Sequence, residues 1–203
     1  APGRLIRGQI DALIEGLTRS LELACQISGE RSALGAVVAL PLAEAWLERN
    51  ESQHARALLD DYLPNATEAG FEDQLISGWL TDARLKRDAG DVAGALARLD
   101  ETIGFANARG LHRLRVAAIA TAIEFHCARG DRDSADSLAM TIGLKRLTPP
   151  EMPEGRITRT DAARAMAWTW LAAARGHHVD ALAIARRWRA RVSAAGAVRD
   201  RVR

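Results

Sequence analysis

The segment Gly90-Asp-Val-Ala-Gly-Ala95 decides which fold we expect for this chain. It opens with a turn residue, and an alanine follows five positions later. Three more segments repeat this spacing, and the four turn residues are separated by steps of 40, 40 and 46 residues. These segments are Asn50-Glu-Ser-Gln-His-Ala55, Gly130-Asp-Arg-Asp-Ser-Ala135 and Gly176-His-His-Val-Asp-Ala181. An internal period of this length is typical of proteins built from repeated helix pairs.

Each feature of the repeated segment has a physical role in a helical hairpin. The turn residue can adopt the left-handed conformation that ends a helix. Asp91 and Asp131 can then cap the next helix by accepting hydrogen bonds from its free amides. The alanine lets two helices approach closely, and a second glycine follows 15 residues later at Gly70, Gly110 and Gly196. We therefore predict an all-α fold, because such pairs bury their apolar faces only by stacking.

Apolar spacing extends the helical prediction to both sides of the repeated segments. Residues 1–32 carry an apolar stripe from Leu5 to Cys25 and form a leading helix that caps the stack and ends at Gly29. An open part of this stripe would favour self-association. The remainder, residues 33–203, is expected to hold units near residues 33–70, 71–110, 111–155 and 156–196 with a basic C-terminal end. We expect about nine helices in a single domain.

The third unit departs from the pattern. Its second helix is predicted to end near Gly143, and the stretch Leu147-Thr-Pro-Pro-Glu-Met-Pro-Glu-Gly155 holds three of the six prolines. Proline removes a backbone donor and clashes with the preceding turn, so this stretch cannot be helical throughout. Two interpretations remain open: a longer connector, or a loop that projects toward a groove or a partner.

Composition places the chain among globular proteins. Of its 203 residues, 48% are hydrophobic and 27% are charged, and the formal net charge is +2. These values exclude disordered and low-complexity classes. No apolar stretch approaches the roughly 20 residues of a membrane span, and the N-terminus lacks a signal-peptide pattern. We therefore expect a cytoplasmic protein that does not contact a membrane, with Cys25 and Cys127 as buried thiols rather than a disulfide.

Glycine, then aspartate, then alanine five residues after the glycine resembles the tetratricopeptide repeat (TPR). Aligning Gly90 and Ala95 on that pattern puts Trp79 at the usual tryptophan position. The small-residue position between the helices falls on Ala43 and Ala83 in the earlier units. In the later units it falls on Ile123 and Thr169, which depart from the pattern. The period of 40 or more residues exceeds the roughly 34 of a typical repeat, so the helices are longer.

Longer repeats of this kind resemble the helical-repeat region of MalT-type regulators of the LuxR family. The resemblance covers about residues 33–196 and rests on pattern. Segments that carry it include Leu40-Pro-Leu-Ala-Glu-Ala-Trp-Leu-Glu-Arg-Asn50, Ala57-Leu-Leu-Asp60, Ala69-Gly-Phe71 and Ala95-Leu-Ala-Arg-Leu-Asp-Glu-Thr-Ile103.

The resemblance implies a TPR-like right-handed superhelix and a function in transcription regulation. In that family an ATP-binding motor precedes the repeats, a helix-turn-helix follows them, and the repeats bind an inducer or a regulatory protein. The chain would then be a fragment of a longer regulator that contacts DNA only through a separate domain. It would act as a non-catalytic sensing and protein-interaction module. The alternative is a free-standing TPR-like adaptor that binds a partner peptide on its concave face.

We find no sequence signature of an enzyme. The chain has no phosphate-binding glycine loop, no zinc-protease motif, no paired cysteines at metal-ligand spacing and no nucleophile elbow. His177 and His178 are adjacent in a predicted turn, so they do not share a helical face at metal-ligand spacing. We therefore expect neither catalysis nor a metal or other cofactor.

The repeat alignment predicts a groove for a ligand or peptide. Trp168 and Trp170 lie about 200° apart around a helix, so the two cannot face the same core. The alignment puts Trp170 on the inner concave face. An arginine in the groove would suit carboxylate or phosphate ligands, because its guanidinium group is planar. The alternatives are a solvated face with internal ion pairs, and a Trp170 that covers the end of the stack. The candidate groove residues are Ser77, Arg84, Arg87, Glu124 and Trp170.

The C-terminal end is basic, since residues 160–203 hold nine arginines and three aspartates. The arginines at 186, 187, 189 and 191 circle the predicted helix instead of forming one stripe. Direct contact with nucleic acid through phosphate neutralisation is one interpretation. A solvated helix end and a linker to a following module are the other two.

Overall fold

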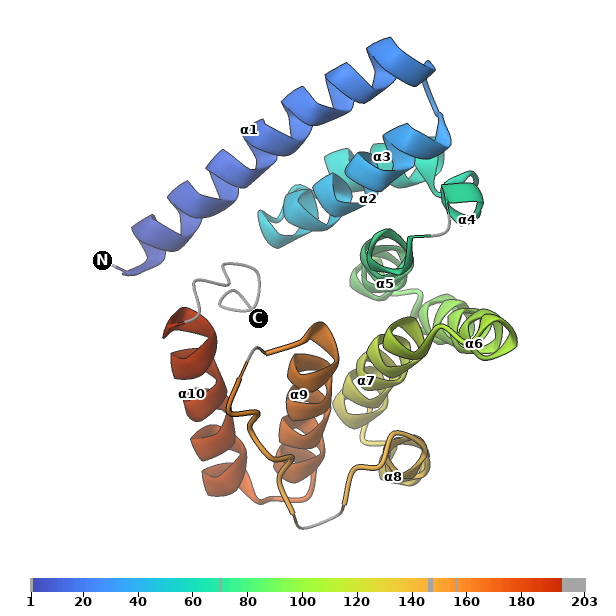
Figure 1. The fold of residues 1–203 in the computed structure, drawn as a ribbon. Helices are drawn as coiled ribbons and strands as arrows, with labels where there is room; N and C mark the ends of the chain where they lie inside the picture. Colours follow the sequence, from blue (N-terminus) through green and yellow to red (C-terminus); the bar gives the residue numbers. More distant parts are fainter. Residues whose placement is uncertain (1, 70, 146–147, 156, 195–203) are drawn as a thin grey trace. The chain divides into compact units, whose positions relative to one another are not determined.

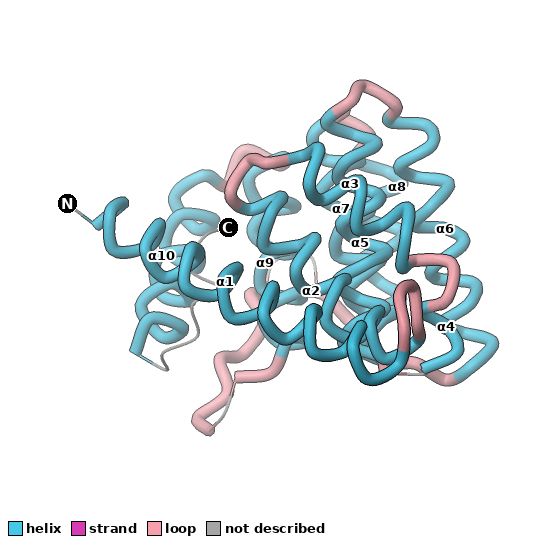
Figure 2. Tube along the Cα trace, turned by 90° about the horizontal axis from the view of Figure 1, so that it is seen from above, coloured by secondary structure: helices cyan, strands magenta, loops and turns pink. Residues whose placement is uncertain are grey.

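The computed structural model describes residues 2–69, 71–145, 148–155 and 157–194 (Figure 1). Within these residues the chain is helical, as predicted, and Figure 2 shows helices and loops but no strand. Nine of the helices have ten residues or more, and a one-turn helix, α4, was not predicted. The helices are α1 (Pro2–Ser28), α2 (Ala33–Glu48), α3 (Ser52–Tyr62), α4 (Ala66–Ala69), α5 (Glu72–Asp88), α6 (Val92–Arg109), α7 (His112–Ala128), α8 (Arg132–Thr141), α9 (Arg159–Ala174) and α10 (His178–Ala194).

The four predicted turn residues all have the left-handed backbone conformation. Their φ angles are 70° at Asn50, 88° at Gly90, 78° at Gly130 and 86° at Gly176. In each turn the amide of the next residue donates to the carbonyl five positions before it, over 2.9 Å. This bond closes a helix C-terminus in the Schellman arrangement. The prediction of one turn chemistry used four times is therefore confirmed.

The helices that follow these turns begin and pack as predicted. Asp91 Oδ1 accepts a hydrogen bond from the Gly94 amide over 2.8 Å, and Asp131 Oδ1 accepts one from the Ser134 amide over 3.2 Å. Hydrogen bonds from Ser134 and from His126 lower the pKa of Asp131 below its ordinary value. The four repeated alanines are buried. They are Ala55, Ala95, Ala135 and Ala181.

The second glycine marker is confirmed at the position that the structure describes. Gly110 has a φ of 68° and directly follows α6. Gly70 and Gly196 lie outside the described residues. Between α8 and Thr158 the described residues, 142–145, 148–155 and 157, are non-helical, as the prolines predicted, and Thr158 forms a capping box with Asp161 at the start of α9.

The chain divides into two compact units. The described residues up to Arg98 form unit 1, and those from Leu99 onward form unit 2, so the boundary falls inside α6. In unit 1, α1 packs along α2, and α2 also packs against α3 and α5 (Figure 1). Ile10 and Ile14 of α1 are buried against Leu42 and Ala45 of α2. The predicted leading helix therefore covers α2, and it ends before Gly29, where φ is 83°.

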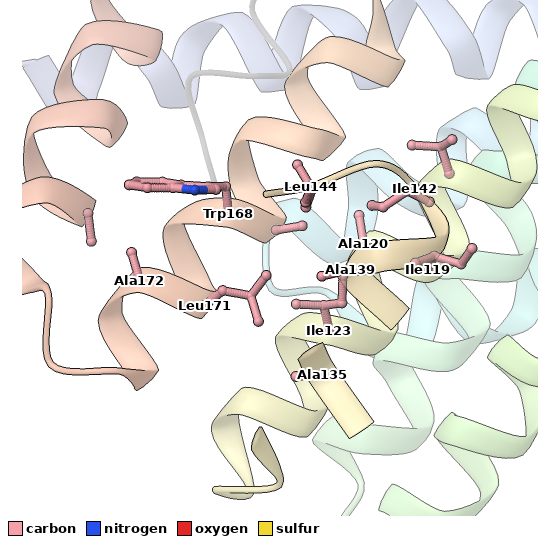
Figure 3. Packing of buried hydrophobic residues seen from close by; sticks show 13 residues of the cluster. Ile119, Ala120, Ile123, Ala135, Ala139, Ile142, Leu144, Trp168, Leu171 and Ala172 are labelled. Atoms are coloured by element: carbon pink, nitrogen blue, oxygen red, sulfur yellow. The ribbon is translucent and has the colours of Figure 1, made fainter. Parts of the chain in front are cut away.

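In unit 2, α7 packs against α8 and α9, and α9 packs against α10. Figure 3 shows the core, in which Ile123 of α7, Ala139 of α8 and Leu171 of α9 converge. The connector between α8 and α9 is held onto this unit. Met152 and Ile157 pack against the cluster of Ala165 and Trp188, and Arg191 donates to the carbonyls of residues 154 and 155. None of the described helices is long and apolar enough to cross a membrane.

Candidate functional site

Ser77 lies in the interior of unit 1, which differs from its expected place on an open groove. The side chain is 1% exposed, and its hydroxyl donates to Glu44 Oε2 over 2.7 Å. Glu44 comes from α2 and is also buried, so this bond joins α2 to α5. The next residue, Gly78, lies against Leu40. Ser77 therefore stabilises the packing of two helices and presents no surface to a ligand.

Arg84 and Arg87 lie near the C-terminal end of α5, and both side chains are half-buried. Arg84 is two turns beyond Ser77 on the same side of the helix. The guanidinium of Arg87 contacts Asp88 Oδ1 through Nε at 2.9 Å and through Nη2 at 2.8 Å. The two arginines give this end of α5 a cationic surface one helical turn long.

Unit 1 also contains an ion-pair cluster that sequence analysis missed. Asp82 of α5 has a side chain that is 5% exposed. It accepts a hydrogen bond from Arg56 Nη1 of α3 over 2.7 Å and one from Arg98 Nε of α6 over 2.8 Å. An aspartate between apolar positions of a helix is a signal for such a cluster, but its partners are distant in sequence. The cluster neutralises a buried carboxylate and ties three helices together.

Trp170 and Glu124 belong to unit 2. Trp170 lies on α9 and is 38% exposed, whereas Trp168 on the same helix is 4% exposed and part of the core. The prediction that the two rings face opposite ways is therefore confirmed. Glu124 lies on α7, which packs along α9, and its side chain is half-buried. Trp170 thus keeps a large apolar surface in the open, which is uncommon for tryptophan in a well-packed helix.

The five predicted groove residues are divided between the two units. Ser77, Arg84 and Arg87 are in unit 1, and Glu124 and Trp170 are in unit 2. Within unit 1 the two arginines share one end of α5, while Ser77 is buried. The alternative prediction, that these residues form a solvated face with internal ion pairs, agrees with the contact between Arg87 and Asp88.

A pocket of about 410 Å³ in unit 1 was not predicted. Its lining comes from α1, from the turn before α2 and from the end of α3, so no local sequence motif marks it. Tyr62 Oη lies 3.3 Å from Cys25 Sγ, and Arg31 pairs with Asp61 over 2.6 Å. Burial, followed by the contact with Cys25, raises the pKa of Tyr62 to about 12. The lining of the pocket therefore combines Tyr62 and Cys25 with charged side chains, which include Glu22.

The remaining aromatic residues and thiols have structural surroundings. Trp188 is buried, and the half-buried Trp46 stacks on His54 with ring centroids 4.6 Å apart. Cys25 and Cys127 are both free thiols that are half-buried instead of fully buried, and burial, with a further contribution from Asp136, raises the pKa of Cys127 to about 11. In the described part of the chain, no group of three or more His, Cys, Asp or Glu side chains could hold a metal ion.

We compared the chain with known protein families, with curated proteins and with solved structures, and none of the three comparisons gave a match.

Proposed function

We propose that this chain is a non-catalytic protein-interaction and effector-sensing module of a LuxR-family, MalT-type transcription regulator. In this proposal its helical hairpins continue as a TPR-like right-handed superhelix. One observation carries the proposal: each of four hairpins closes with a residue in the left-handed conformation, the same backbone hydrogen bond and a buried alanine at the same spacing. Repetition of one hairpin builds an extended surface, and such surfaces serve binding.

Two parts of the surface have the chemistry that this function needs. Arg84 and Arg87 lie together near the C-terminal end of α5, and a guanidinium group is able to exchange its present partners for the carboxylate or phosphate of a ligand. Trp170 offers an exposed ring that can stack on a ligand or cover an apolar side chain. A ligand that prefers one arrangement of the hairpins would shift the population toward it and so bias attached modules. The same population shift would result whether the ligand is an extended peptide or a small inducer.

Substitution of an arginine tests the ligand-binding part of the proposal. We expect Arg84→Glu to abolish effector binding in isothermal titration calorimetry against a panel of anionic metabolites and acidic peptides. The far-UV circular dichroism spectrum should stay unchanged, because the side chain is only half-buried. Asp60→Arg on α3 is a suitable control, since it changes an exposed charge elsewhere in unit 1. Binding that survives Arg84→Glu would remove Arg84 from the site.

The regulator assignment is tested by the gene. Sequencing the complete reading frame should show a nucleotide-binding motor before the repeats and a helix-turn-helix after them. A reading frame that lacks both modules would contradict the regulator and favour the free-standing adaptor.

A further inference from the structure

The outer side of α1 carries apolar side chains that unit 1 leaves uncovered. The opposite side of this helix buries Ile10 and Ile14, whereas Leu23 is 58% exposed and Ile27 is 77% exposed. Ala12 is also exposed, and a Cβ added at Gly16 would meet nothing within 4 Å. These four residues lie on one side of the helix and form a ridge, which the exposed Arg19 and Ser20 interrupt between Gly16 and Leu23. We call the ridge, with the neighbouring Glu15 and Glu22, the α1 face.

The charge beside this ridge is acidic. Glu15, Glu22 and Glu30 are all exposed, and Arg19 is the one basic residue between positions 15 and 30. Arg19 lies 3.4 Å from Glu15, and the three glutamates outnumber this one arginine in the stretch. The α1 face is therefore an apolar ridge with a negative border.

The outer side of α10 has the opposite charge. Its inner side buries Ala181 and Trp188 in unit 2. On its outer side Val179 is 82% exposed and Leu182 is 49% exposed. Arg186 and Arg189 follow on the same side one and two turns later, and both are exposed. We call Val179, Leu182, Arg186 and Arg189 the α10 face.

We propose that the α10 face of one copy of the chain binds the α1 face of a second copy. Both faces are helix surfaces with exposed large apolar side chains, which mark interaction sites when they group together. Charge decides which faces meet. Two α10 faces would bring arginines together and two α1 faces would bring carboxylates together, whereas the mixed pair is complementary.

A single contact of this kind uses a different surface on each copy and leaves one α1 face and one α10 face free. Further copies can add through these free faces, unless they close on each other in a ring, a two-membered ring included. This association does not depend on the proposed function in regulation. It predicts that the mass of the particle grows with protein concentration instead of stopping at a dimer, unless a ring closes.

Sedimentation velocity of the 203-residue chain across a series of concentrations tests the proposal. Leu182→Glu adds a carboxylate to the α10 face, and Ile27→Lys adds an ammonium group to the α1 face. Each new charge faces charges of the same sign on the partner copy. We therefore expect association at least about tenfold weaker. Met140→Glu and Phe71→Lys are matched controls, because both residues are exposed apolar side chains outside the two faces. The controls should associate like the unchanged chain.

A mixture of the two defective variants gives the decisive result. Each variant keeps one intact face, so an equimolar mixture of Leu182→Glu and Ile27→Lys should associate more strongly than either variant alone. The proposal is overturned if the unchanged chain is monomeric at every concentration. It is also overturned if either variant associates as strongly as the unchanged chain, which would indicate a contact between two like faces, or if the mixture associates no more strongly than the separate variants.

Discussion

At the scale of single residues, Asp82 shows how a buried charge is accommodated in this protein. Its carboxylate lies among helices and accepts hydrogen bonds from Arg56 and Arg98. A buried carboxylate without such partners would be strongly unfavourable. The two arginines keep about a third of their side-chain surface exposed, at 38% and 32%, so water screens their charges if the aspartate is removed.

We therefore expect Asp82→Ala to destabilise the fold by about 1–3 kcal/mol, below the cost of leaving a fully buried charge unpaired. Urea unfolding followed by circular dichroism measures the change. Asp88→Ala is the matched control on the same helix, because Asp88 is exposed and pairs only with its neighbour in the described contacts. The control should change stability by less than about 0.5 kcal/mol. Equal effects of the two substitutions would show that burial of Asp82 is unimportant.

Burial also governs the chemistry of Cys127. Its pKa is raised to about 11 by burial, with a further contribution from Asp136. In a Cys25→Ser background, we expect alkylation by iodoacetamide to rise about tenfold per pH unit up to about pH 10 without a plateau. For the urea-unfolded chain, the rate of alkylation should level off once the pH passes the ordinary pKa of a thiol. A plateau below pH 9 in the folded chain would contradict the raised pKa.

The same shift has a consequence for stability. A raised pKa means that the folded chain disfavours the thiolate, so the contribution of Cys127 is complete below its unfolded-state pKa. This contribution is lost as the pH rises from there toward 11.

Ser77 shows why the candidate site was harder to predict than the turns. The repeat alignment gave its position along α5, but burial depends on the tilt of α5 against α2, where Glu44 accepts its hydrogen bond. That Trp168 and Trp170 do not share one core was predictable, because their spacing already required different faces of the helix. The partners of Asp82 and the lining of the pocket at Tyr62 come from helices distant in sequence, and local spacing carries no signal for them.

At the scale of helices, the close approach of α2 and α5 depends on Gly78. A Cβ there would lie 2.8 Å from Leu40 Cδ1 and 2.9 Å from Leu63 Cδ1. Leu40 is fully buried, so its side chain would have to shift within a packed interior to make room. By contrast, Gly104 in α6 has nothing within 4 Å of an added Cβ. Replacing each of the two glycines by alanine therefore distinguishes the effect of packing on stability from the effect of helix propensity.

We expect Gly78→Ala to destabilise the protein by about 1–3 kcal/mol through overpacking. Gly104→Ala should stabilise it by up to about 1 kcal/mol, because alanine favours the helix more than glycine. Thermal unfolding of both variants beside the unchanged chain measures these shifts. If Gly78→Ala stabilised the protein instead, α2 and α5 would have to be further apart than they are in this structure.

Most helix boundaries were predictable because they depend on local chemistry. The left-handed residues at the hairpin turns and the aspartate caps act within a few positions, so their spacing is visible in the sequence. The one-turn α4 was missed because no periodic pattern extends over so few residues. The connector before α9 was expected to be non-helical, but Met152 packs against unit 2 through contacts that no local pattern reveals.

At the scale of the whole molecule, the chain consists of two compact units instead of one uniform stack of contacts. The boundary inside α6 was not predicted, since the repeat spacing continues through this helix without interruption. The proposed function requires exposed recognition surfaces in these units. Trp170 is the one of them with a large aromatic ring, which is 38% exposed whereas Trp168 on the same helix is buried in the core.

Selection of a random peptide library on the immobilised chain tests most directly whether this protein is an interaction module. The unchanged chain, Trp170→Ala and the control Met140→Ala are compared by fluorescence polarisation with the selected peptides. We predict peptides that bind the unchanged chain and Met140→Ala equally and bind Trp170→Ala at least about tenfold more weakly, since stacking on one ring contributes on the order of 1 kcal/mol or more. Peptides that bind all three proteins equally, or no enrichment at all, would contradict the proposal.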